Sequence, residues 1–201
     1  MKKAYLLIFL AYTVLSGAAQ SSAQSKPTML TAPANWQFET FSLPPGFAPA
    51  VKYHGREELR FSPGWDKKEA RDYFTIIWGF RFDETKSVSQ EDIKDFLQTY
   101  FRGLCSSTAR NRHLTPVDSS AVSVSLQKPA ADKPQVYNAT LHLFGVFADG
   151  LPVTLNAEIK VMEDGAHQKT YLLMIASTQG KTDPVWEPLY KEQREFVIPS
   201  N

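Results

Sequence analysis

The sequence predicts an α+β domain with a mostly antiparallel sheet of about six to eight strands, one long central helix and a C-terminal helix packed on it. Apolar and polar residues alternate, as they do in strands, in both halves of the chain. A single long helical pattern separates the two sets of strands. Turn residues connect most strands directly, and this order favours antiparallel pairing over strand–helix–strand repeats.

The first 23 residues have the pattern of a secretory signal peptide. Lys2 and Lys3 precede an uncharged, mostly apolar run over 4–15, and small polar residues follow. This run is shorter than the ~20 residues that a membrane-spanning helix needs. Small residues at the −3 and −1 positions predict cleavage after Ala19 or Ala23. We therefore expect an exported protein, either periplasmic or secreted.

After the leader, residues 24–35 are rich in Ser, Pro and Ala and are expected to be a flexible lead-in. The remaining chain, 36–201, has the length of one domain, since domains usually contain ~100–200 residues. We found no internal linker that would divide it.

Three regions of the first half predict strands. Apolar and polar residues alternate over 36–40, and 51–53 with 57–61 suggests a hairpin around His54 and Gly55. The clearest alternation covers 73–83 and predicts one buried face. Its apolar members are Phe74, Ile76, Trp78, Phe80 and Phe82.

A helix is predicted over 90–104, where the apolar period changes from two residues to three or four. Ser87 or Ser89 could cap it, and Ser87 with Gln90 fits a capping box. Its apolar positions are Ile93, Phe96, Leu97, Tyr100, Phe101 and Leu104.

The second half predicts a meander of strands over 120–126, 135–147, 151–162 and 169–178. Asp149 and Gly150 form a strong hairpin signal between the middle two strands. Along 151–162 the odd positions are apolar, whereas Thr154, Asn156, Glu158 and Lys160 are expected to face solvent. A closing helix is expected to begin near Pro184 or Pro188, because proline is tolerated in a first helical turn.

The charge and the cysteine content exclude several functions. The chain has 22 Lys and Arg residues against 21 Asp and Glu residues, and two of its lysines lie in the leader. A nearly neutral mature chain has no field that would attract nucleic acid. Cys105 is the only cysteine, so no intramolecular disulfide can form. We expect Cys105 to be a buried, structural side chain.

His142 is the one candidate catalytic residue, because it lies in the middle of a predicted strand and could act as a base within a cleft. A histidine that packs within the sheet is the simpler interpretation. The four histidines lack zinc-ligand spacing, so neither a metal site nor a cofactor is predicted. His54 could share a metal with Glu57, but a polar turn explains that pair equally well.

Trp65 is the candidate ligand-binding residue. Fifteen of the 25 aromatic residues lie between Trp36 and Phe101, and aromatic side chains form platforms for apolar molecules and sugars. Trp65 follows a Ser-Pro-Gly turn and precedes three charged residues, so its ring could be presented to solvent. Alternatively, it folds back and covers the core.

Residues 57–65, 73–78 and 100–104 together resemble exported bacterial proteins that carry no assigned activity. The resemblance covers about residues 57–105. It implies export and a strand–strand–helix unit, and it transfers no catalytic residues.

Three functions remain open at this point. The sequence favours a non-catalytic module that binds an envelope protein or a small apolar or glycan ligand. An alternative is an envelope-associated hydrolase with an active site around His142. The third is a structural accessory that docks on another envelope protein through its sheet.

Overall fold

The computed structural model describes residues 29–31, 33–85, 87–128 and 135–198; the predicted signal peptide lies outside them. Seven strands form one antiparallel sheet in the order β1-β2-β3-β7-β6-β5-β4, which confirms the predicted fold class. The strands are β1 (Gln37–Leu43), β2 (Gly55–Phe61), β3 (Ile76–Phe82), β4 (Ser123–Gln127), β5 (Val136–Phe144), β6 (Pro152–Asp164) and β7 (Lys169–Ser177). The helices are α1 (Gln90–Asn111) and α2 (Trp186–Glu195), with a 3-10 turn at Ser119–Ala121.

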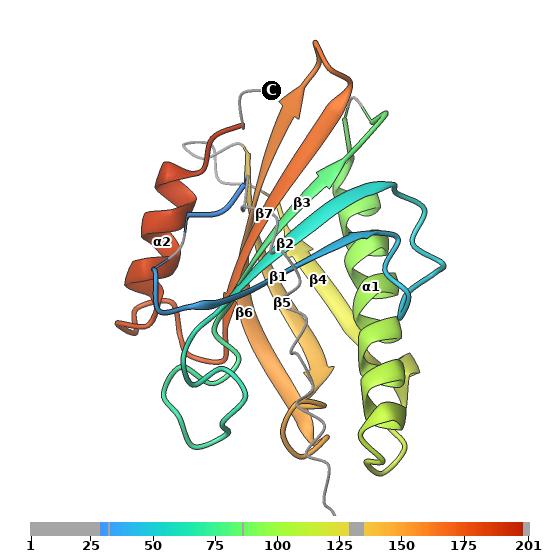
Figure 1. Cartoon of the computed structure of the whole chain (residues 1–201), viewed down its shortest axis with the longest axis vertical. Helices are drawn as coiled ribbons and strands as arrows, with labels where there is room; N and C mark the ends of the chain where they lie inside the picture. Colours follow the sequence, from blue (N-terminus) through green and yellow to red (C-terminus); the bar gives the residue numbers. More distant parts are fainter. Residues whose placement is uncertain (1–28, 32, 86, 129–134, 199–201) are drawn as a thin grey trace, which may run out of the picture.

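The helices cover opposite faces of the sheet, as Figure 1 shows. The larger core lies under α1 and contains the buried face of β3 that the alternation predicted, including Trp78 and Phe80. The smaller core lies under α2, where Ile77 of β3 meets Trp186 and Leu189. β3 is therefore buried on both faces, so the prediction of a single buried face for 73–83 was wrong, because α2 covers the second face. The outermost strand β4 is covered on one face only.

α1 begins at Gln90, as predicted, but ends seven residues later than expected. Ser89 is the N-cap, and its hydroxyl accepts from the backbone N–H of Asp92, whose carboxylate accepts from the N–H of Ser89. This reciprocal pair satisfies two free N–H groups at the helix start, so Ser89 rather than Ser87 forms the capping box. The helix continues to Asn111, because Cys105 and Ala109 extend its buried stripe.

The expected hairpin around His54 and Gly55 was wrong. β2 begins at Gly55 and pairs with β1 on one side and β3 on the other. Residues 51–53 belong to the long connection between β1 and β2, and Val51 and Tyr53 are buried in the core under α1. Their apolar spacing reflects this burial rather than a strand.

The polar face of β6 is partly covered, although it was expected to face solvent. Glu158 is 8% exposed and accepts from Gln193 Nε2 of α2 at 3.1 Å. Lys160 Nζ donates to the carbonyls of Gln193 and Phe196 at the end of that helix. The polar side chains are tolerated there because α2 and the residues after it supply hydrogen-bond partners.

Residues 29–31, part of the expected flexible lead-in, are instead fixed against the α2 face. Met29 and Leu30 are buried, and both of their backbone N–H groups donate to Glu58 Oε2, at 3.0 and 3.3 Å. The Thr31 N–H donates to Glu192 Oε1 at 2.7 Å. Composition does not reveal this, because the acceptors lie on β2 and α2.

Candidate functional site

The strongest candidate site is a pocket between α1 and the β1–β2–β3 half of the sheet, which we call the aromatic pocket. Its volume is about 210 Å³, and eight of its twelve lining residues are aromatic. The aromatic members are Phe41, Phe47, Phe61, Trp65, Phe74, Trp78, Tyr100 and Phe147. The others are Glu39, Leu59, Ile76 and Leu104.

Strand register builds the floor of the pocket. Glu39, Leu59 and Trp78 are directly opposite one another across β1, β2 and β3, and Phe61 is opposite Ile76 in the next row of the same face. Side chains two residues apart on a strand share a face, so these rows all point towards α1.

The roof comes from α1 and from the connection that follows β1. The Phe47 ring packs edge-on against Tyr100 of α1, with centroids 5.1 Å apart. Gly103 makes this approach possible, because a Cβ there would lie 2.5 Å from the Phe47 carbonyl oxygen and 2.7 Å from the Ala48 Cβ. A glycine in the middle of a helix is thus explained by the close approach of another backbone.

Trp65 lines the aromatic pocket and is half-buried. Its ring lies 4.5 Å from that of Phe61 and 4.9 Å from that of Phe147. The two sequence interpretations of Trp65 are therefore compatible, since its ring folds back onto the core and also forms part of a cavity wall.

A buried acid lies beside the pocket on β2. Glu57 is fully buried, and its Oε1 accepts a hydrogen bond from the Tyr100 hydroxyl at 3.2 Å. Burial raises the pKa of Glu57 to about 8; the Tyr100 hydrogen bond opposes this shift, and the nearby Glu39 carboxylate adds to it. Glu57 is therefore mostly a neutral carboxylic acid at neutral pH.

Two buried polar atoms near the pocket, Glu57 Oε2 and Trp78 Nε1, make no well-formed hydrogen bond to the described residues. Burial and the Glu57 carboxyl raise the Tyr100 pKa, whereas a weaker hydrogen bond from the Trp78 N–H to the Tyr100 hydroxyl opposes them. Buried polar groups are normally paired, and these two atoms have almost no accessible surface, so neither of them faces the pocket.

The rim of the aromatic pocket is acidic. Glu39 and Phe41 of the edge strand β1 are exposed, so the pocket is open on that side. Partial burial raises the pKa of Glu39. The lining contains no Lys, Arg or His, and an anionic ligand would therefore find no counter-charge there.

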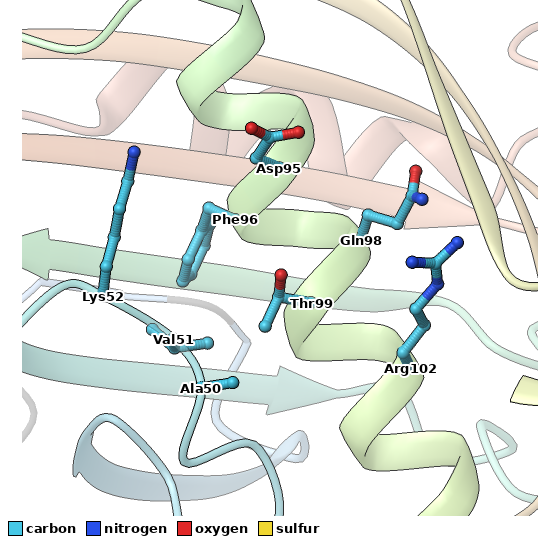
Figure 2. Close-up of a pocket in the computed structure, with 8 residues that line it drawn as sticks. All are labelled: Ala50, Val51, Lys52, Asp95, Phe96, Gln98, Thr99 and Arg102. Carbon is cyan, nitrogen blue, oxygen red and sulfur yellow. The ribbon is translucent and has the colours of Figure 1, made fainter. Parts of the chain in front are cut away.

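A second hollow lies between the loop at 50–52 and the outer side of α1, and Figure 2 shows that it is lined largely by polar side chains. Lys52 is bonded to Asp92 at 2.7 Å, and the guanidinium of Arg102 reaches the Ser120 carbonyl at 3.4 Å. Both of its cationic groups already have partners in the protein, so this hollow is a weaker candidate than the aromatic pocket.

The structure places His142 away from the aromatic pocket. Leu141 and Leu143 on either side of it point into the core under α1, so His142 lies on the opposite face of β5. It is exposed there, with Nδ1 3.0 Å from Thr154 Oγ1. Cys105 is 1% exposed, as expected, and burial raises its pKa.

Within the described ranges, no cluster of three or more His, Cys, Asp or Glu side chains is arranged to hold a metal ion. The helices in that part of the chain are also too short or too polar to cross a membrane.

The buried position of Glu57 beside this pocket was not predicted from the sequence. The signal was present, because Glu57 shares a two-residue period with Leu59 and Phe61 and is thus an acid on an apolar face. The sequence was interpreted instead as a polar turn, or as a metal pair of His54 and Glu57. The chain matches no family model, and neither a curated protein nor a solved structure matches it.

Proposed function

We propose that this protein is an exported, non-catalytic binding module whose aromatic pocket holds a small apolar molecule. The observation that carries the proposal is an aromatic cavity of about 210 Å³ whose only titratable lining residues are Glu39 and Tyr100. Ligand sites are typically apolar cavities with a few polar groups that fix orientation.

The size of the cavity limits the ligand. An engineered cavity of ~150 Å³ lined by aliphatic and aromatic side chains binds benzene. A cavity of about 210 Å³ suits a single ring or a short alkyl chain. It is too small for a peptide, and its few polar groups do not suit a glycan.

The lining favours binding over catalysis. It contains no Ser, Cys or His that could act as nucleophile or general base, and its titratable groups are Glu39 and Tyr100. Burial together with the Glu57 carboxyl raises the Tyr100 pKa well above its usual value, so this phenol does not ionise readily.

Toluene is a suitable first probe, because it is one ring with no charge. Saturation-transfer NMR on the mature chain should show saturable toluene binding that Leu104→Trp abolishes, since a larger ring at this lining position fills the cavity. Leu151→Trp is the matched control, because Leu151 is 56% exposed and lies outside the pocket. It should bind toluene as the wild type does.

Circular dichroism must show that both variants are folded. The binding proposal fails if the folded wild type shows no saturable toluene signal, or if folded Leu104→Trp retains it.

Export is tested separately. Mass spectrometry of the protein purified from expressing cells should show a chain that begins after Ala19 or Ala23. Recovery of a mature pool that retains Lys2 would rule out the predicted processing.

A further inference from the structure

We infer that the molecule held in the aromatic pocket carries a quaternary ammonium group, whose positive charge lies against the aromatic rings and is balanced by Glu39. The inference rests on the proposed function and specifies its ligand class. The outer surface of such a group consists of methyl groups, so it suits an apolar cavity and adds one positive charge.

The aromatic rings supply the first half of the argument. They make up most of the lining, and the face of an aromatic ring carries partial negative charge. Several of these rings keep accessible surface, since Phe41 is exposed and Phe47, Trp65 and Phe147 are half-buried. A cation within ~6 Å of such a ring face is attracted to it, and aromatic cages bind quaternary ammonium ligands in this way.

The cations of the described residues leave these rings to a ligand. The lining contains no Lys, Arg or His. Lysine and arginine side chains do lie over aromatic rings elsewhere in the described part of the chain, namely over those of Phe38, Tyr53 and Trp186. None of these three rings lines the aromatic pocket.

Glu39 supplies the second half of the argument. It is the one carboxylate of the lining, and it lies on the exposed edge strand β1 at the rim. Partial burial raises the pKa of Glu39, and no cation among the described residues opposes that shift. A carboxylate without a cationic partner, beside a cavity without cations, is the counter-charge that a cationic ligand requires.

Other charged groups around the pocket do not take this role from the ligand. Lys68 is paired with Asp149, and Arg112 donates to the Phe147 carbonyl. The buried Glu57 is mostly protonated at neutral pH and adds no charge. The carboxylate at the rim is therefore left to pair with a ligand.

The same features separate a quaternary ammonium from other charged groups. An anion would meet the acidic rim and no cation in the lining. A primary ammonium is strongly hydrated, and the lining offers only the side-chain acceptors of Glu39 and Tyr100 to replace its water. A quaternary ammonium has no N–H group, so it enters an aromatic cavity without losing hydrogen bonds.

Choline and a dimethylbutanol of the same shape test the charge directly, because a tert-butyl group replaces the trimethylammonium group. At neutral pH the mature wild-type chain should bind choline about tenfold more tightly than the dimethylbutanol, measured by saturation-transfer NMR. Burial of apolar surface alone would favour the dimethylbutanol. Ethanolamine, which has a primary ammonium, should bind more weakly than choline.

Variants then identify the groups responsible. Glu39→Gln keeps the shape of the side chain and removes its charge, so it should lower the preference for choline several-fold. Glu187→Gln is the matched control, because Glu187 is an exposed residue of α2 on the opposite face of the sheet, and it should keep the wild-type preference. Trp65→Leu removes a ring from the lining and should also lower the preference. Dimethylbutanol affinity in each variant shows whether the cavity is intact.

The outcomes distinguish this inference from the proposed function. If the dimethylbutanol binds as tightly as choline, or if Glu39→Gln keeps the full preference, the inference is overturned, and toluene bound by the same wild-type protein would show that the binding function holds. Failure of every probe, toluene included, would overturn the proposed function itself.

Discussion

At the scale of single residues, the unusual feature is an acid placed where the fold would accept a hydrocarbon. Glu57 lies between Phe41 and Phe80 across three strands, on the face that carries the core. An ionised carboxylate is costly in such surroundings, so the residue stays protonated and has a pKa of about 8. Its proton makes the stability of the molecule depend on pH.

The pKa of Glu57 is raised in the folded protein from an ordinary value of 4.5, so the folded state binds more protons than the unfolded state between these values. The protonated Glu57 therefore stabilises the folded state, and this stabilisation is complete below pH 4.5 and is lost as the pH rises through 8. Relative to Glu57→Gln, which does not titrate, wild-type unfolding free energy should fall by up to about 1.4 kcal/mol per pH unit in this window. Urea denaturation of both proteins at several pH values measures it, and parallel pH profiles would contradict the prediction.

Phe80 tests the packing of the same face. It is fully buried, and its ring lies 5.0 Å from Phe96 and 5.6 Å from Tyr100. Phe80→Ala should lower the unfolding free energy by roughly 3–5 kcal/mol, the usual cost of truncating a buried aromatic residue. Leu151→Ala is the control, since an exposed side chain usually changes stability by less than ~0.5 kcal/mol. Chemical denaturation compares the two, and a loss below about 1 kcal/mol for Phe80→Ala would mean that this face is not packed.

At the scale of elements, α1 and the connection between β1 and β2 fit together through Gly103. Replacing a mid-helix glycine by alanine usually stabilises a protein by roughly 0.5–1 kcal/mol. Here the new methyl group would meet the Phe47 carbonyl at 2.5 Å, so Gly103→Ala should instead destabilise the fold by roughly 1–3 kcal/mol. Gly46→Ala adds a methyl group in open space on the same connection and is the matched control. Thermal unfolding that shows a stabilised Gly103→Ala variant would exclude the close contact.

Sequence patterns identified those elements whose periodicity arises from their own burial. β3 was predicted within three residues of its observed limits, and the start of α1 was predicted correctly although the helix continues seven residues further than expected. The connection at 44–54 has no regular structure and a similar apolar content, so it was mistaken for a strand at 51–53. Met29 and Leu30 are held by Glu58, a partner far along the chain, and no local pattern could reveal that contact.

The same distinction applies to the candidate site. Trp65 was selected from its turn and its charged neighbours, and the structure places it in the wall of the aromatic pocket. Whether Trp65 binds a ligand stays a prediction. Glu57 and Tyr100 lie 43 positions apart in the chain, so only the packing of α1 on β2 brings them together.

At the scale of the whole molecule, the sheet consists of two contiguous meanders. β1, β2 and β3 come from the first half of the chain, and β7, β6, β5 and β4 come from the second. The halves meet where β3 pairs with β7, from Ile76 opposite Ala176 to Phe82 opposite Thr170. α1 belongs to the first half of the chain but also packs against β4 and β5 of the second half. The helix therefore spans the junction between the two halves, as the sheet does.

This junction means that the chain can be divided without dividing either meander. The link between α1 and β4 is largely exposed around Thr115 and Pro116, and a break there would leave β1–β3 with α1 in one fragment and β4–β7 with α2 in the other. Each fragment would present one long, unpaired strand edge to the other, which is the geometry of a split protein that reassembles from its parts. Two such fragments, fused to the halves of a reporter enzyme and expressed together, should therefore restore its signal, and charged substitutions at Ile77 and Ile175 should abolish that complementation.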